Sequence, residues 1–206
     1  MGRWLRYPLV LASASPRRQQ LLQEAGYEFE VVAPPVSEPP APARAVLRPA
    51  AWAEALAYFK ARSVAGLRPQ ALILAADTLC LHGQTIIGKP RDLAEARRIL
   101  SEQFGGRNEV ITGLALLLPA RGERLLTHVV TTLIMRPMNP AELEAYLASG
   151  AWQGKAGAYA LQEGGDRFVQ AMAGSASNVV GLPLEKVEEL LGRFGGEQGR
   201  EVERDA

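Results

Sequence analysis

The chain has 206 residues, with 23 Lys and Arg against 22 Asp and Glu, a formal net charge of +1 and a single cysteine. A chain of this length buries enough apolar surface to fold without a disulfide or a structural metal. The near-zero charge argues against nucleic acid or an anionic membrane as the main partner, since both attract proteins with a field of one sign. A small anionic ligand stays compatible with it. We expect one domain, 1–206, with a polar tail over about 195–206.

The N-terminal segment is a poor match to a secretory signal. Its apolar run, residues 9–12, is shorter than the about 7–15 residues of a signal core, and a Pro-Arg-Arg follows closely. No stretch approaches the roughly 18 uninterrupted apolar residues of a membrane helix. We therefore expect a cytoplasmic protein, and the lone Cys80 is consistent with a reducing compartment.

The first quarter of the chain predicts a strand, a helix and a second strand before a long loop. Residues 9–12 are an apolar run typical of a buried strand. Ser15 and Pro16 then have the character of a helix start, and Gly26 marks its end. Residues 27–32 alternate like a strand, whereas the six prolines within 33–49 exclude regular structure and predict a stiff surface loop.

The central part predicts two helices and three strands. One helix covers 50–67, and a second opens at Asp92 with Glu95 at capping-box spacing and ends near residue 104. The predicted strands are a buried run at 71–76 that stops before Asp77 and Thr78, and a hairpin formed by 109–118 and 124–135.

The last third adds a helix from Asn139 to Gly150, a strand at 168–172 and a helix at 184–194. Strands and helices therefore alternate along most of the chain, with a hairpin in the middle. This order predicts an α/β fold with a mixed central sheet and flanking helices.

Several common chemistries have no motif here. The sequence contains no phosphate-binding Gly-x-x-x-x-Gly-Lys-Ser/Thr loop, no Gly-x-Gly-x-x-Gly, no His-x-x-x-His and no paired cysteines. His82 and His128 stand alone and are interpreted as surface or strand histidines. Cys80 has no histidine placed to activate it, so we interpret it as a small buried residue and not as a nucleophile.

The segment Leu11-Ala-Ser-Ala-Ser-Pro-Arg-Arg is the first candidate site. A strand leads into small hydroxyl residues and a proline-started helix with two cations in its first turn, where they oppose the helix dipole. A bound anion that takes up the helix amides, the hydroxyls and an arginine would relieve that cost. The segment is equally compatible with a capped helix that carries solvated arginines.

Asp77 and Lys89 form the second candidate. A carboxylate after a buried strand lies where open α/β sheets place ligands, and it suits a divalent cation or the activation of water. A turn or helix-cap aspartate is the plain alternative. Lys89, in Gly88-Lys-Pro, offers one ammonium to a phosphate but is also at home on a surface.

Two glycine-rich stretches are weaker candidates. Residues 154–165 let the backbone approach a ligand closely, and Gln162 within them has donors and acceptors that match the edge of a base. Residues 174–183 have the composition of another close-approach loop, or of a simple turn before the last helix.

Taken in order, these segments resemble the Maf family of nucleoside triphosphate pyrophosphatases over about residues 9–190. The resemblance rests on five motifs in the right order and spacing: Ser13-Ala-Ser-Pro-Arg-Arg, Ala76-Asp-Thr, Gly88-Lys-Pro, Ala156-Gly-Ala-Tyr-Ala-Leu-Gln and Gly181-Leu-Pro. It implies a mixed α/β fold related to that of the inosine triphosphate pyrophosphatases, with two lobes around a nucleotide cleft. A homodimer is also compatible with it.

The resemblance further implies a subgroup. Arg17, Thr78 and Gln162 stand where the branch that acts on dTTP and UTP carries Arg, Thr and Gln. The implied reaction is hydrolysis between the α and β phosphates, which gives a nucleoside monophosphate and pyrophosphate. Two alternatives stay open: a pyrophosphatase for 7-methyl-GTP or other modified purine nucleotides, and a non-catalytic nucleotide-binding regulator of septum formation.

Roles for individual residues follow from the resemblance as a hypothesis. Asp77 holds or deprotonates the attacking water and binds Mg²⁺ or Mn²⁺ together with Glu38, while Thr78 and Gln162 select the base. The groups expected to hold the phosphate chain are Ser13, Arg17, Lys60, Lys89 and Lys155. The chain departs from the family pattern at Ser37, which replaces an acid beside Glu38, and at Asn108, which replaces a histidine.

The lysines themselves are informative, because only 4 of the 23 cations are lysine. Three of them, Lys60, Lys89 and Lys155, fall at positions of the family pattern. We interpret these as places where a compact ammonium is needed, and expect Lys186 to be replaceable.

Overall fold

The computed structural model describes residues 5–36, 48–159 and 166–194. Its centre is a seven-stranded sheet in the order β2-β1-β3-β5-β6-β7, with β4 paired to the far end of β3. The strands are β1 Leu9–Leu11, β2 Glu30–Val31, β3 Leu72–His82, β4 Thr85–Ile87, β5 Arg107–Leu118, β6 Glu123–Met135 and β7 Val169–Ala173. β1 pairs in parallel with β2 and β3, and all other pairs are antiparallel. The predicted mixed α/β fold is confirmed.

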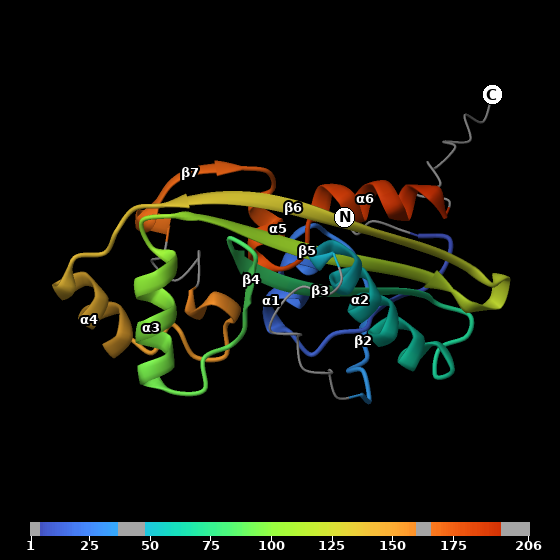
Figure 1. The fold of residues 1–206 in the computed structure, drawn as a ribbon. Helices are drawn as coiled ribbons and strands as arrows, with labels where there is room; N and C mark the ends of the chain where they lie inside the picture. The colour runs from blue at the N-terminus through green and yellow to red at the C-terminus, as the bar shows by residue number, and fades with distance from the viewer. Residues whose placement is uncertain (1–4, 37–47, 160–165, 195–206) are drawn as a thin grey trace, which may run out of the picture.

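Helices cover both faces of this sheet and form two lobes along it (Figure 1). One face packs against α2, whereas α1 and α6 cover the other. Beyond them, α3 and α4 pack around the far end of the long β5–β6 hairpin. The helices are α1 Pro16–Glu24, α2 Pro49–Ala65, α3 Leu93–Gln103, α4 Pro140–Ala148, the short α5 Ala176–Val180 and α6 Leu184–Arg193. Within the described ranges, no helix combines the length and apolarity needed to cross a membrane.

Helix starts follow the local sequence signals closely. Pro16 occupies the first turn of α1, and the side chain of Asn139 accepts from the backbone of Glu142 in a complete capping box at α4. At α3 the predicted box is half formed, because Asp92 accepts from the Glu95 amide while the Glu95 carboxylate turns back to the amide of Arg91. The predicted strand at 27–32 contracts to Glu30–Val31.

The prediction that the strand before Asp77 stops at residue 76 is wrong, because β3 runs on to His82. Its far half stays paired with β5, and apolar residues continue to alternate through Leu79 and Leu81. On the other edge, β1 pairs with β3 only as far as Leu74, and β4 joins only at Cys80. Among the described strands, none pairs with residues 75–79 on that side, so the sheet has a gap where Asp77 lies.

The alternation of side chains along β3 gives its two polar residues different neighbours. Ile73 and Ala75 pack on the α2 side, and Asp77 continues that row. Leu74 and Ala76 pack on the α1 side, and Thr78 continues theirs. The gap beside β3 is therefore accessible to groups from both faces of the sheet.

A glycine opposite Asp77 sets how close α2 comes to the sheet. Gly113 on β5 pairs with Asp77 in register, so both residues face α2. A Cβ at Gly113 would lie 2.2 Å from the backbone carbon of Ala53 in α2. Only glycine permits this approach, which also brings the Lys60 side chain of α2 to Asp77.

Replacing Gly113 by Ala is expected to lower the free energy of unfolding by about 1–3 kcal/mol, because helix backbone must shift to admit the methyl group. Urea titration measures the change. The matched control is Gly192→Ala in the exposed last turn of α6, where an added Cβ meets nothing within 4 Å. The free energy of unfolding of that control should equal the wild-type value or be higher by up to about 0.5–1 kcal/mol. Equal stability of wild type and Gly113→Ala would contradict the role given to this contact.

Candidate functional site

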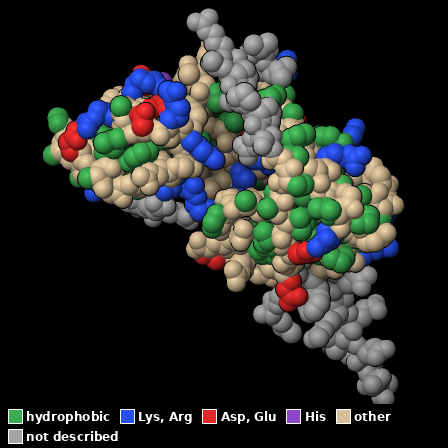
Figure 2. Space-filling model, turned by 90° about the horizontal axis from the view of Figure 1, so that it is seen from below, with side chains coloured by type: hydrophobic (Ala, Val, Ile, Leu, Met, Phe, Trp, Pro, Cys, Tyr) green, Lys and Arg blue, Asp and Glu red, His purple; other side chains and the backbone are tan. Residues whose placement is uncertain are grey.

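The gap beside β3 opens into a cavity of about 760 Å³. Figure 2 shows the hollow between the two lobes, with Lys and Arg side chains gathered in it. Its walls come from segments far apart in the sequence: the β1–α1 turn, α2, β3, the loop after β4, the end of α3, β5, β6, residues 154–159 and the end of α5. Four of the five motifs singled out from the sequence thus meet here within the described residues, together with Ala156, Gly157 and Tyr159 of the fifth.

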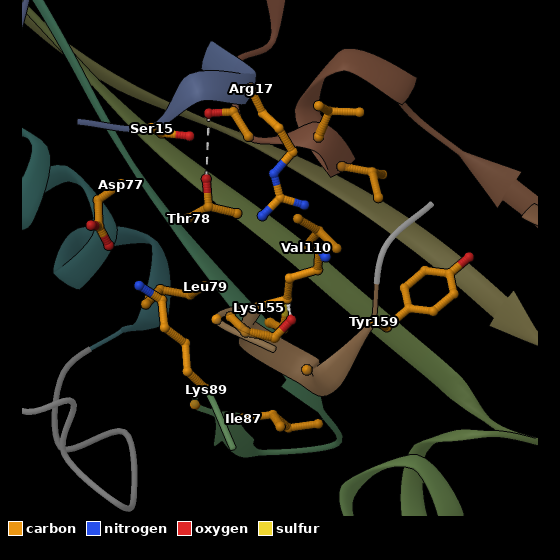
Figure 3. Close-up of a pocket in the computed structure, with 18 of the residues that line it drawn as sticks. Ser15, Arg17, Asp77, Thr78, Leu79, Ile87, Lys89, Val110, Lys155 and Tyr159 are labelled. Atoms are coloured by element: carbon orange, nitrogen blue, oxygen red, sulfur yellow. Dashed lines mark hydrogen bonds between the residues drawn. The ribbon is translucent and has the colours of Figure 1, made fainter. Parts of the chain in front are cut away.

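Positive charge dominates the described part of this cavity. Its lining includes five cationic side chains and two carboxylates, Asp77 and Glu109. The cations are Arg17, Arg18, Lys60, Lys89 and Lys155. In Figure 3, Arg17, Asp77, Lys89 and Lys155 project into one space from four different segments. Such a surplus of cations around one cavity suits a small polyanion, even though the whole chain is close to neutral.

Lys60 and Asp77 form a buried ion pair at the base of the cavity. The Lys60 Nζ donates to Asp77 Oδ1 at 2.5 Å, and the two residues are 7% and 5% exposed. A charge this deeply buried needs a partner, and each group supplies one for the other. The contact also fixes the orientation of the carboxylate, because one of its oxygens is held by α2.

Arg18, which the sequence interpretation left without a role, joins three walls of the cavity. Its Nε donates to the Gly181 carbonyl at 2.8 Å and its Nη2 to Thr78 Oγ1 at 3.0 Å. Its Nη1 lies 3.5 Å from Ser13 Oγ, which also accepts from the Ser15 amide. The two arginines of the Ser-Pro-Arg-Arg motif therefore differ: Arg18 braces the turn, whereas Arg17 extends into the cavity (Figure 3).

The hydroxyl of Thr78 already has protein partners. Thr78 Oγ1 accepts from Arg18, lies 2.9 Å from Thr112 Oγ1 and lies 3.5 Å from the Gly181 carbonyl. A hydroxyl has one proton to donate and two acceptor positions, so these contacts use most of its capacity. Any influence of Thr78 on base choice acts through Arg18 in this geometry, or requires an exchange of partners.

The other two lysines at positions of the family pattern lie on adjoining loops. Lys89 is exposed after β4, and Lys155 precedes a short turn at Ala156–Ala158, where its Nζ donates to the Ala151 carbonyl at 2.6 Å. All three lysines at positions of the family pattern thus line one cavity, in agreement with the interpretation that a compact ammonium is needed at each. Lys186 lies elsewhere, on α6, and pairs with Glu189.

Neither Cys80 nor the histidines supply a nucleophile or base in the described site. Burial raises the pKa of the Cys80 thiol to about 12, against the opposing effect of the nearby Arg17 charge, so the thiol stays protonated at neutral pH. His82 lies on β3 and bonds to Asn108, and His128 lies on β6 beside Glu54. The interpretation of both as strand histidines is confirmed.

Two predicted site residues, Glu38 and Gln162, lie outside the described residues, as does Ser37. In the described ranges no group of three or more His, Cys, Asp or Glu side chains is arranged to hold a metal ion. Asp77 lines the cavity, and its Oδ1 accepts a hydrogen bond from Lys60.

Comparison with known proteins agrees with this geometry. The model of the family described as "Maf-like protein" matches residues 8–194. The chain belongs to the Maf family. The matched range contains every described segment that lines the cavity, so the Maf signature and the cavity coincide.

Curated Maf relatives match almost the full length of the chain. A protein named "dTTP/UTP pyrophosphatase" from Moorella thermoacetica is 44% identical over 187 residues, which cover 91% of this chain and 95% of the relative. Proteins of the same name from Geobacter sulfurreducens and Vibrio cholerae are 44% and 42% identical. Those alignments cover 91% and 90% of this chain and 96% and 97% of the two relatives.

Proposed function

We propose that this protein hydrolyses dTTP and UTP to the nucleoside monophosphate and pyrophosphate. The observation that carries the proposal is a buried, oriented carboxylate, Asp77, in a cavity lined by five cationic side chains. A triphosphate needs that charge, and its hydrolysis needs an activated water. The names and the identity of the curated relatives support the same activity.

The residues of the cavity have different roles in the reaction. Lys89, Lys155 and Arg17 hold the phosphate oxygens and offset the charge that builds up as the bond between the α and β phosphates breaks. Asp77 orients the attacking water and accepts its proton, with its own position set by Lys60. The water oxygen bonds to the α phosphorus as the bond from that phosphorus to the bridging oxygen breaks, and the pyrophosphate leaves with the electron pair of the broken bond.

A divalent cation fits this site in part. Mg²⁺ in phosphate-transfer sites is held by one or two carboxylates together with substrate phosphates and water, so one carboxylate, that of Asp77, is enough on the protein side. We propose Asp77 as a ligand for Mg²⁺ or Mn²⁺, with Glu38 as the second. The ion would neutralise phosphate charge when bound.

We propose Thr78 and Gln162 as the residues that select the base. A site that hydrogen-bonds a base rejects a mismatched one because buried polar groups are left unpaired. Arg18 is part of this selection, since it holds Thr78 and Gly181 on the same wall.

The experiment is a pyrophosphate-release assay on dTTP, UTP, CTP, GTP, 7-methyl-GTP and ITP, with Mg²⁺ or Mn²⁺. We expect kcat/KM for dTTP and UTP to exceed that for each purine nucleotide by about tenfold or more. A preference for 7-methyl-GTP would overturn the choice of substrate. Binding without turnover of any nucleotide would overturn the enzymatic proposal in favour of a nucleotide-binding regulator.

A further inference from the structure

The loops that carry Lys89 and Lys155 meet at one residue, Gly157. Its amide donates to the Gly88 carbonyl at 3.1 Å, and Gly88 directly precedes Lys89. Lys155 precedes Gly157 by two residues and caps the same short turn. The position of Gly157 therefore sets the positions of both lysine-bearing backbones.

Gly157 is held from behind by the side chain of Gln103. The Gln103 Nε2 donates to the Gly157 carbonyl, and Gln103 is 5% exposed at the end of α3. Gly157 is itself buried, with φ at 74°. An added Cβ would lie 3.4 Å from both Cys80 Cβ and Gln103 Oε1. The turn is thus pressed against β3 and α3, and its carbonyl is directed at the Gln103 amide.

Gln103 is in turn tied to the sheet. Asn108 Nδ2 on β5 donates to the backbone carbonyl of Gln103 at 3.0 Å. Because the amide of Asn108 donates through Nδ2, its Oδ1 accepts, and His82 Nδ1 on β3 donates to it at 2.8 Å. A continuous set of hydrogen bonds therefore runs from two central strands through Gln103 to the lysine loops.

We propose that Gln103 is a positioning residue for the triphosphate, acting through Gly157 on Lys89 and Lys155. Gln103 lines the cavity, but its amide is turned to the backbone of the turn. Removing that donor leaves a buried carbonyl without this partner, and the turn then relaxes away from α3. Both ammonium groups move with it. The inference rests on the proposed function only for the identity of the ligand.

The test is Gln103→Met, which keeps the length of the side chain and removes the amide. We expect the KM for dTTP to rise about tenfold, the equivalent of one lost hydrogen bond, with kcat reduced less. The same substitution is then made in a Lys89→Met/Lys155→Met background. In that background Gln103→Met should change the KM for dTTP by less than about twofold, because the two ammonium groups that Gln103 positions are absent. A general loss of packing would persist in that background.

The control for stability is Leu190→Ala, a core substitution on α6 away from the cavity. It should lower the melting temperature while leaving the KM for dTTP unchanged. If Gln103→Met does not fold, Gln103→Asn replaces it, because the amide is kept but is one methylene too short to reach Gly157. Unchanged kinetics in the variant used, or an equal effect with and without the two lysines, would overturn the inference.

Gln103 can still be tested if the proposed hydrolysis is wrong. If the wild type turns over no nucleotide, equilibrium binding of dTTP to the wild type and to Gln103→Met replaces the kinetics. About tenfold weaker binding by the variant supports the positioning role. Equal binding overturns it.

Discussion

Replacing Asp77 by Asn is expected to lower kcat for dTTP by a factor of about 10²–10⁴, the usual contribution of a general base. The amide cannot accept a proton from water, but it has the size of the carboxylate and keeps an oxygen near the Lys60 ammonium that now binds Oδ1. The variant should therefore stay folded while it loses turnover. Pyrophosphate release at saturating dTTP measures the change, and far-UV circular dichroism confirms the fold.

A matched control is Asp92→Asn, the same exchange at the N-cap of α3. Asp92 accepts from the Glu95 amide there, and Asn caps a helix about as well as Asp does. This variant should keep wild-type kcat. Turnover by Asp77→Asn within about fivefold of wild type would show that another group takes the proton, and the base would then have to be sought elsewhere in the cavity.

Much of the fold could be predicted from local sequence signals. Apolar runs and helix starts predicted nine strands and helices to within two residues at each end, because Pro16, Asn139 and the glycines act through their own backbone. The length of β3 could not be predicted this way. Its continuation past Asp77 depends on pairing with β5, whose partner residues lie 26 to 34 positions further along the chain. No local pattern reports such a partner.

In the site, too, local motifs could be predicted from the sequence, whereas contacts between distant segments could not. Asp77, Lys89 and Arg17 were found because they stand in short motifs, and the resemblance to the Maf family pattern indicated Lys60 and Lys155. The contacts between them come from the tertiary fold. No pattern in the sequence indicated that Lys60 would pair with Asp77, because the pair depends on how closely α2 packs on the sheet, and Gly113 permits that approach opposite Asp77.

Arg18 and Gln103 were missed for different reasons. Arg18 stands in a motif, and its neighbour Arg17 received the role; only the fold shows that Arg18 turns toward Thr78 and Gly181. Gln103 lies at the end of an amphipathic helix and has no motif of its own. Its position near Gly105 and Gly106 marked only a helix end, and its burial is shown by the fold alone.

Lys60→Met is expected to be strongly destabilising, by about 3 kcal/mol. The Asp77 carboxylate is 5% exposed and would lose the ammonium that holds its Oδ1, and removing one member of a buried ion pair is costly. Urea unfolding measures the loss. The matched control is Lys186→Met, which removes a lysine from an exposed pair with Glu189 on α6. A surface pair contributes about 0–1 kcal/mol, so the free energy of unfolding of that variant should be close to the wild-type value.

The double variant Lys60→Met/Asp77→Asn separates the ion pair from the rest of the site. With both charges removed, the penalty of the unpaired carboxylate disappears, so the double variant should be more stable than Lys60→Met alone by about 2 kcal/mol. It should nevertheless be inactive, because the carboxylate is absent. If the two substitutions were simply additive in the free energy of unfolding, Lys60 and Asp77 would not stabilise each other. The buried pair would then serve the triphosphate rather than the fold, and the orientation of Asp77 would depend on its remaining contacts.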